Sequence, residues 1–322
     1  MDYQSTCRIR IPTINHWVGQ QDVIRRFRVA LDAAFQDGTR LPHMLFTGPP
    51  GVGKTELAHL AAREMCVEIH ERIAQVISNI GTMNGLLMQA GHKEIIFLDE
   101  IHELLPNMQT LVYRAMEGGQ VTIQKADNQT FSIPINDITI IGATTDEYAL
   151  LRPLRDRFKL ILPFTEYSSG DLAHITLQRA KLKGIQLSED VAVNIAERSR
   201  GTPRLAIRLL ESCHRYARSQ GEDQITPDHF SRTVELDGID HVGLGTDEQR
   251  YLQFLAKRPG EAIRLMTIES AINVHRRTIQ SVVEPYLIQI GFIERQQAGR
   301  VITNAGLAHL DMTEALIESN GG

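Results

Sequence analysis

One run of eight residues decides the fold: Gly48-Pro49-Pro50-Gly51-Val52-Gly53-Lys54-Thr55. A short apolar run, Met44-Leu45-Phe46, precedes it, and helix-forming residues follow it from Glu56 to Glu64. A strand, a glycine turn and a helix in this order form an anion cradle, because backbone N–H groups of the turn and of the helix N-terminus point at phosphate oxygens. We therefore expect the loop, continued by Glu56, to bind ATP. Lys54 would reach the β and γ phosphates, and the Thr55 hydroxyl would hold Mg²⁺.

Two later apolar runs end in polar residues. Ile95-Ile96-Phe97-Leu98 leads into Asp99 and Glu100, and Ile138-Thr139-Ile140-Ile141-Gly142-Ala143-Thr144 leads into Thr145. Such runs are typical of parallel strands that are buried on both faces and carry a ligand site at their carboxyl ends.

These three polar residues are candidates for the chemistry of hydrolysis. We expect Asp99 to orient Mg²⁺, Glu100 to polarise the attacking water, and Thr145 to hydrogen-bond that water or the γ phosphate. Asp99 and Glu100 are also suited to the acidic start of a helix, and a threonine after a strand is often an ordinary turn residue.

The bulk composition is that of a soluble globular protein. The 322 residues are 42% hydrophobic and 23% charged, which predicts two or three domains. No apolar run is long enough to span a membrane, and the N-terminus does not resemble a signal peptide, so we expect a cytoplasmic protein. The net charge of −5 implies that any contact with DNA is local.

A helix from Pro106 to Glu117 is predicted to lead into a β-hairpin. The segments 120–124 and 129–133 alternate apolar with polar residues around a turn-like stretch. The apolar face of this hairpin either covers the sheet or stands out to bind a partner, and the periodicity does not distinguish the two.

An arginine-rich run follows the second strand. It contains three arginines in six residues: Arg152, Arg155 and Arg157. Such a run either offers a guanidinium to the nucleotide of a neighbouring subunit or forms a salt-bridged surface.

The remaining sequence predicts two helical domains. Caps at Ser168, Ser188, Thr202-Pro203 and Thr226-Pro227 mark four helices of a small bundle. In its third helix, Arg204 opposes the helix dipole, which a contact with nucleotide would explain. The glycine-rich stretch 238–245 is predicted to be a linker, and Thr246 to cap the helix after it.

Three helices and a two-stranded wing after this linker predict a winged helix. Four arginines would contact DNA phosphates: Arg276, Arg277, Arg295 and Arg300. Many winged helices bind protein instead, so that alternative stays open. The tail beyond Asp311 is expected to fray.

The fold class is therefore α/β. A parallel-sheet P-loop domain (1–165) is followed by a helical lid (166–240) and a winged-helix DNA-binding domain (241–322).

Together these motifs resemble the AAA+ ATPases and, more narrowly, the RuvB family of Holliday junction branch migration motors. The resemblance extends over almost the whole chain. Besides the phosphate loop it rests on four segments: 17–20 (Trp-Val-Gly-Gln), 153–158 (Pro-Leu-Arg-Asp-Arg-Phe), 199–204 (Ser-Arg-Gly-Thr-Pro-Arg) and 284–288 (Glu-Pro-Tyr-Leu-Ile).

The resemblance assigns roles to individual residues. It implies that Lys54 and Thr55 are Walker A, Asp99 and Glu100 Walker B, Thr145 sensor 1, Arg157 the arginine finger and Arg204 sensor 2. It also implies adenine contacts from Tyr167 and the backbone near Val18.

The partners that the resemblance implies are duplex or four-way junction DNA, further copies of this chain in a hexameric ring, and a RuvA-like adaptor that docks on the hairpin over 120–135. Departures from the family lie at 73–81, at 103–105 and in the weakly basic wing, all outside the residues that hydrolyse ATP.

The rival functions are a protein-remodelling ATPase and a loader-type ATPase. Remodelling machines grip polypeptide with an aromatic residue between Walker A and Walker B, but no Phe, Tyr or Trp occurs from Cys66 to Glu94. Loader subunits carry a zinc module or a Ser-Arg-Cys finger, and this chain has neither motif.

Overall fold

The computed structural model describes residues 11–124 and 130–320. The chain divides into two compact units. One comprises Met1–Ile175 with Gly201–Arg204, and the other comprises Thr176–Arg200 with Leu205–Gly322. The predicted fold class, a P-loop domain with a parallel sheet followed by a helical lid and a winged helix, is confirmed.

The first unit is built on a five-stranded parallel sheet with the order β2-β3-β6-β1-β7. Its strands are β1 (Met44–Thr47), β2 (Ile69–Ile73), β3 (Ile95–Asp99), β6 (Thr139–Thr144) and β7 (Leu160–Pro163). The predicted runs form β3 and β6, in which Ile95 pairs with Thr139. Because the strands are parallel, the residues that follow β1, β3 and β6 share one edge of the sheet.

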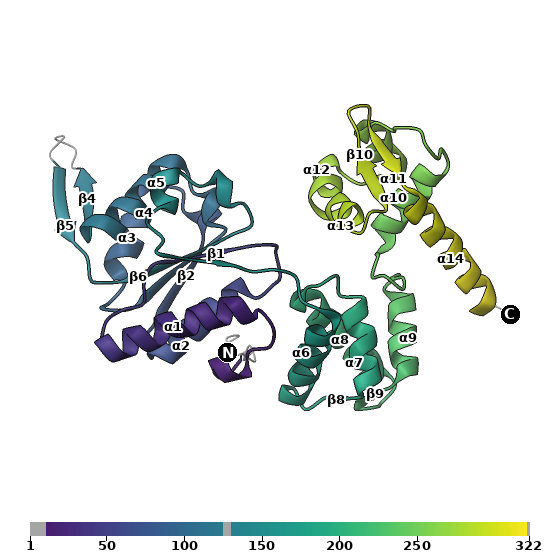
Figure 1. The fold of residues 1–322 in the computed structure, drawn as a ribbon, viewed down its shortest axis with the longest axis horizontal. Helices are drawn as coiled ribbons and strands as arrows, with labels where there is room; N and C mark the ends of the chain where they lie inside the picture. The colour runs from purple at the N-terminus through teal and green to yellow at the C-terminus, as the bar shows by residue number, and fades with distance from the viewer. Residues whose placement is uncertain (1–10, 125–129, 321–322) are drawn as a thin grey trace. The chain divides into compact units, whose positions relative to one another are not determined.

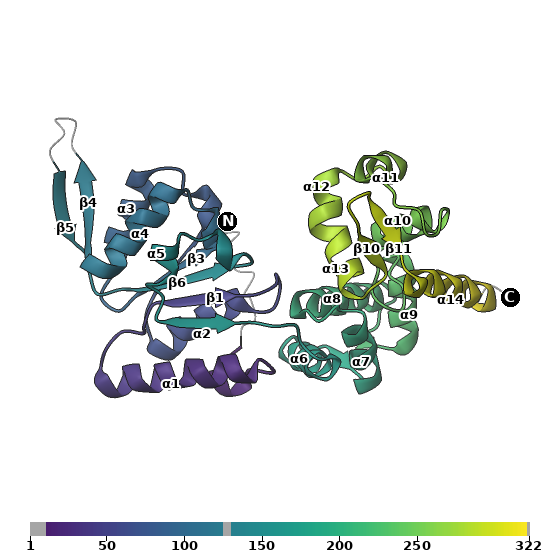
Figure 2. The same cartoon turned by 45° about the horizontal axis from the view of Figure 1, so that its top comes forward.

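Helices cover both faces of this sheet. Figures 1 and 2 show α1 (Gln21–Asp37) and α2 (Lys54–Met65) on one face, and α3 (Ile80–Gln89) and α4 (Pro106–Gly118) on the other. A short helix, α5 (Arg152–Arg155), follows β6. Two Leu side chains of α2, Leu57 and Leu60, are fully buried, so the helix that begins at the phosphate loop is fixed to the core.

The hairpin forms a sheet of its own and does not cover the main one. Strand β4 (Gln120–Gln124) pairs antiparallel with β5 (Thr130–Pro134), and the pair projects from the unit (Figure 1). At its base Val121 is only 2% exposed, whereas Phe131, which lies near the start of β5 and pairs with Ile123, is 42% exposed. The predicted turn, 125–128, and residue 129, which was predicted to begin the second strand, lie outside the described residues.

The lid consists of four helices, as predicted: α6 (Ser169–Leu182), α7 (Glu189–Glu197), α8 (Pro203–Ser219) and α9 (Pro227–Leu236). Two short strands, β8 (Gln186–Leu187) and β9 (Gln224–Ile225), pair in parallel beside them. Ser168 caps α6 by accepting the Asp171 N–H at 3.1 Å, and Thr226 forms a capping box with His229. Ser188 occupies the N-cap position of α7, as predicted, but its hydroxyl accepts no capping bond.

The winged helix follows with the predicted order of elements. Helices α10 (Thr246–Ala256) and α11 (Leu265–Ile272) precede a third helix, which consists of α12 (Arg276–Thr278), a π-helical turn (Ile279–Val283) and α13 (Glu284–Gln289). The wing is formed by β10 (Ile293–Arg295) and β11 (Arg300–Ile302). Pro285 lacks the N–H that an α-helix would use here, which accounts for the wider turn before it.

Three details of this region differ from the predictions. The tail does not fray after Asp311, because α14 continues from Asn304 to Asn320. Gly245, and not Thr246, caps α10, and its N–H donates to the Glu248 carboxylate at 3.1 Å. The stretch 238–245 is not a free linker, since Asp240 Oδ1 accepts the N–H groups of Val242 and Leu244 at 3.0 and 2.8 Å.

Among the described residues, no helix combines the length and the apolar character needed to cross a bilayer.

Candidate functional site

The phosphate loop is a backbone cradle that only glycine permits. Gly48, Gly51 and Gly53 have φ angles of 128°, 82° and 103°, which side chains rarely adopt. A Cβ added to Gly48 would lie 2.2 Å from the carbonyl oxygen of Phe164. The loop therefore passes close to the end of β7 and leads directly into the N-terminus of α2, the arrangement in which backbone N–H groups can bind an anion.

Lys54 begins α2 and is only 6% exposed. Its Nζ donates to the carbonyl oxygens of Gly48 at 2.5 Å and Pro49 at 3.0 Å. Burial lowers the pKa of Lys54, and the carboxylates of Glu100 and Asp99 oppose that shift. Both of the carbonyl acceptors are neutral, so the ammonium charge is available to a phosphate.

Asp99 and Glu100 lie at the carboxyl end of β3, where the sequence predicted them. The N–H of Glu100 donates to Asp99 Oδ1 at 3.1 Å. Burial, followed by the nearby charge of Glu100, raises the pKa of Asp99. A bound cation would favour the ionised carboxylate here.

Thr145, directly after β6, contacts Glu100. Its N–H and its hydroxyl donate to Glu100 Oε2 at 3.2 and 3.1 Å. Glu100 itself has a φ of 49°, a left-handed conformation that is uncommon outside glycine and asparagine. The ends of two adjacent strands thus fix the carboxylate that would act as the base.

His102 also belongs to this group, although the sequence analysis assigned it no role. Its Nδ1 lies 2.9 Å from the hydroxyl of Thr144 and 3.3 Å from Glu100 Oε2. Its position two residues after Glu100, at the carboxyl end of a buried strand, is the signal that could have identified it.

The expected adenine contacts converge on the phosphate loop. Tyr167 is 8% exposed, and its N–H donates to the carbonyl of Gly201 at 2.9 Å. A Cβ on Gly19, the neighbour of Val18, would lie 2.7 Å from the Tyr167 ring. Burial raises the pKa of the Tyr167 phenol, so it stays protonated. A Cβ on Gly53 would lie 3.4 Å from the Trp17 ring, which places that indole beside the loop as well.

Arg204 and Glu56 lie at two other sides of the loop. The Arg204 N–H donates to Gly51 O at 3.3 Å, and a Cβ on Gly51 would lie 3.1 Å from Arg204 Cβ. The Glu56 carboxylate accepts bonds from the N–H of Ile11 at 3.1 Å and from Arg63 at 3.3 Å. With its side chain so engaged, Glu56 can offer a phosphate only its backbone N–H.

Arg157 forms an ion pair away from the phosphate loop. Its Nη2 lies 2.6 Å from Glu117 Oε1 near the end of α4, and its side chain is 39% exposed. Arg155 is bound to Glu147, and Arg152 is 91% exposed with Asp156 at 3.7 Å. The structure therefore does not bring Arg157 together with Lys54, Asp99 and Glu100 of its own chain.

The four arginines expected at DNA fall into two pairs. Glu284, whose side chain is fully buried, accepts bonds from Arg295 Nε and Arg300 Nε, each at 2.8 Å, and from the Tyr251 hydroxyl at 2.9 Å. Burial opposes ionisation of Glu284, but these donors hold its pKa below the usual range. Arg276 and Arg277 are exposed at the start of the third helix.

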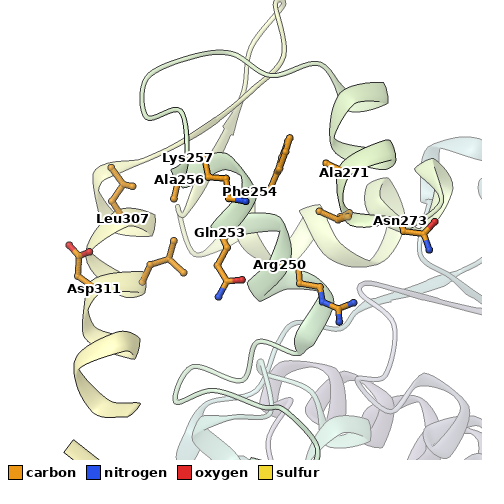
Figure 3. A pocket seen from close by; sticks show the side chains of 11 residues that line it. Arg250, Gln253, Phe254, Ala256, Lys257, Ala271, Asn273, Leu307 and Asp311 are labelled. Atoms are coloured by element: carbon orange, nitrogen blue, oxygen red, sulfur yellow. The ribbon is translucent and has the colours of Figure 1, made fainter. Parts of the chain in front are cut away.

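The winged helix also contains a hollow whose lining includes none of these four arginines. Its volume is about 760 Å³, and its walls come from α10, α11 and α14, with the cations of Arg250 and Lys257 among them (Figure 3). Phe254, Leu307 and Leu310 supply the apolar part of the lining.

Comparison with known proteins identifies the three parts of the chain. The model of the Holliday junction DNA helicase RuvB P-loop domain matches residues 9–164, the RuvB AAA lid domain matches 167–240, and the RuvB C-terminal winged helix domain matches 241–311. The chain belongs to the RuvB family.

Relatives and solved structures agree with this assignment to the RuvB family. The Holliday junction branch migration complex subunit RuvB of Methanoregula boonei is 36% identical over 311 residues, which cover 95% of this chain and 93% of the relative. The RuvB subunit of Rubrobacter xylanophilus is 34% identical over 313 residues, 96% and 88% of the two chains.

The structure of the Thermotoga maritima RuvB Holliday junction branch migration motor superposes with a TM-score of 0.80 at 34% identity, covering 94% of this chain and 98% of that one. A point mutant of the same protein gives a TM-score of 0.83. Membership of a P-loop AAA+ family implies that this chain binds nucleotide.

Proposed function

We propose that this RuvB family member is an ATP-driven motor that moves duplex DNA at four-way junctions in recombination and repair. The observation that carries the proposal is the fixed position of Glu100, which Thr145 holds at the sheet edge that also carries Lys54. A carboxylate fixed in this way can activate a water, and a buried cation can stabilise the phosphate charge.

The nucleotide would occupy the cradle from Gly48 to Glu56. Lys54 would bind its phosphates, Arg204 would contact them from the first turn of α8, and Val18 with Tyr167 would contact the adenine. The glycine geometry of the loop supports this fit, because a Cβ at Gly48 would clash with the backbone of Phe164 and force the loop out of this conformation. The oxygens of Thr55 and Asp99 suit Mg²⁺, which would neutralise phosphate charge during hydrolysis.

Arg157 would act on the nucleotide of a neighbouring copy in a hexameric ring. Its guanidinium forms an ion pair with Glu117, a carboxylate whose side chain is 57% exposed at the surface of the unit. A head-to-tail arrangement of copies closes into a ring when the rotation allows it, and each site would then be completed by the next subunit.

Arg276 and Arg277 are the strongest candidates for DNA contacts, because both are exposed and start the third helix. Arg295 is 47% exposed and can share its charge between Glu284 and a phosphate. Arg300 is 16% exposed in its side chain and bound to the same carboxylate, so its main effect would be to stabilise the wing.

The projecting hairpin would dock on a RuvA-like adaptor. Phe131 is 42% exposed, so this projection offers an apolar surface that an adaptor could contact. We further propose domain boundaries at 165/166 and 240/241, and a cytoplasmic location for a motor that acts on DNA.

The test is the ATPase rate measured with and without four-way DNA, with particle imaging of the same sample. We expect junction DNA to stimulate hydrolysis and rings to be visible around duplex arms. Hydrolysis that ignores junctions but responds to unfolded protein would favour a remodelling ATPase.

A further inference from the structure

Two sets of contacts meet at a single peptide bond, between Arg200 and Gly201. On the Gly201 side, the chain contacts the nucleotide site. Gly201 O accepts the N–H of Tyr167 at 2.9 Å, and three residues later Arg204 donates to Gly51 O at 3.3 Å. A Cβ on Gly201, whose φ is 68°, would lie 2.8 Å from Glu166 Cβ, so this segment is closely packed.

On the other side of that bond, the Arg200 side chain contacts the start of the winged helix. Its Nε donates to Gly243 O at 2.7 Å, and its Nη1 donates to Glu248 Oε1 at 2.8 Å. Its guanidinium lies 4.8 Å from the centre of the Tyr286 ring, on the third helix. Arg200 therefore uses its fork and its flat face on three separate segments, a combination that lysine cannot reproduce.

These partners are themselves fixed. The Glu248 carboxylate also accepts the Gly245 N–H at 3.1 Å, and the Tyr286 hydroxyl donates to Val242 O at 3.1 Å. Glu248 is 6% exposed, so its ion pair with Arg200 is shielded from solvent. A Cβ on Gly243 would lie 2.3 Å from the carbonyl oxygen of Arg198, which shows how closely the chain approaches the end of α7.

The backbone at Arg200 adopts a conformation of unfavourable free energy. Arg200 has a φ of 47°, and Gly201 continues with a positive φ. A left-handed conformation is unfavourable at a non-glycine residue and persists only where the surrounding structure holds it in place. The three contacts of the Arg200 side chain hold the backbone in this conformation.

We propose that Arg200 is a positioning residue that couples the nucleotide site to the third helix of the winged helix. A shift of Gly201–Arg204 on nucleotide binding would change the orientation of Arg200 and, through Glu248 and Tyr286, that of the helix that begins with Arg276. This inference rests on the proposed motor function and adds to it the residue through which hydrolysis reaches DNA.

The experiment compares Arg200→Ala, Arg200→Lys and a control, Lys183→Ala, in the full-length protein. Lys183 forms an ion pair with Glu211 inside the lid at 2.5 Å, so this control removes an interaction of the lid without touching the winged helix. Basal ATPase activity and junction migration are measured together. We expect Arg200→Ala to keep basal hydrolysis within about twofold while migration per ATP hydrolysed falls at least tenfold.

Arg200→Lys should recover part of the coupling, and Lys183→Ala should behave as wild type. The proposal is overturned if Arg200→Ala migrates junctions as efficiently per ATP as wild type. It is also overturned if hydrolysis and migration fall in parallel, because the role would then be structural only.

A second measurement separates this inference from the proposed function. Backbone hydrogen exchange over 241–248 and 276–290 is followed with and without a slowly hydrolysed ATP analogue. Wild type should show a nucleotide-dependent change in these segments, and Arg200→Ala should lose it. If wild-type protein moves no junction, the proposed function fails, and this exchange comparison still decides the role of Arg200.

Discussion

The nucleotide site and the winged helix both depend on charged side chains, but they use them differently. At the nucleotide site Lys54 from the start of α2 meets Asp99 and Glu100 from the end of β3 at one edge of the sheet. In the winged helix, Arg295 and Arg300 are bound to a buried carboxylate, whereas Arg276 and Arg277 remain exposed. A charged residue within a sequence motif therefore indicates a catalytic or binding role. An arginine on a surface element indicates a DNA contact only if it has no ion-pair partner within the chain.

The largest effect is expected from Arg157→Ala. Removal of an arginine finger lowers kcat by about 10³-fold or more, and nucleotide affinity should be retained because Arg157 has its ion pair with Glu117 and not at its own phosphate loop. Steady-state ATPase assays and nucleotide titrations measure both quantities. Arg152→Ala is the matched control, since Arg152 is exposed and should be dispensable. Full turnover by Arg157→Ala would show that the site is not shared.

Glu100→Gln should have the next largest effect. The amide keeps an acceptor for Thr145 but cannot take a proton, so kcat should fall by about 10²- to 10³-fold while ATP still binds. Single-turnover hydrolysis separates chemistry from binding. Retained turnover would exclude Glu100 as the base.

Glu284→Ala tests whether the ion pairs of Arg295 and Arg300 with Glu284 stabilise the winged helix. It leaves Arg300 without its buried partner, which should lower the free energy of unfolding by about 3 kcal/mol. Denaturant unfolding measures this change, and Glu294→Ala on the exposed face of the wing is the control. Unchanged stability would mean that the ion pair contributes nothing.

The same carboxylate predicts a pH dependence. Because its partners hold the pKa of Glu284 below its ordinary value of 4.5, its contribution to stability is present above that value and is lost as the pH falls through the lowered pKa. Glu284→Gln should flatten the stability profile in this acid range. If the variant had the same dependence of stability on pH as wild type, carboxyl groups other than Glu284 would be responsible for it.

The smallest effect is expected from the exposed arginines. Replacing both Arg276 and Arg277 with Ala should weaken duplex binding and reduce the salt dependence of log K by about 0.9 for each DNA phosphate that is no longer neutralised. Arg300→Ala, in contrast, should lower stability and leave the salt slope unchanged. Binding titrations at several salt concentrations distinguish the two outcomes, and equal slopes for all variants would place the DNA contacts elsewhere.

Among the strands of the main sheet, the sequence predicted those that are buried along their whole length. Strands β3 and β6 are buried throughout, so their continuous apolar runs identified them. Strand β2, Ile69–Ile73, was missed because it lies at the edge of the sheet and contains His70, Glu71 and Arg72. Strand β7 was missed because it has only four residues and ends in Pro163.

Helix α3 was missed because Gly81 and Gly85 lower its helix propensity, although its cap was visible in the sequence. Asn79 accepts the Thr82 N–H at 2.8 Å, as an N-cap residue does.

The residues of the nucleotide site could be placed from the sequence because strand order and parallel pairing bring consecutive strand ends to one edge. The sequence could not show that Glu284 is the partner of Arg300, because the burial of Glu284 depends on tertiary packing around Tyr251.

Whether ATP is hydrolysed at a site shared by two copies of the chain can be decided by mixing two inactive variants. Arg157→Ala keeps Glu100, and Glu100→Gln keeps Arg157, so a mixed ring contains interfaces in which both residues are intact. The account predicts that a 1:1 mixture recovers ATPase activity up to about a quarter of wild type, the share of such interfaces expected in head-to-tail rings. A mixture that assembles into mixed rings but remains as inactive as either variant alone would contradict it.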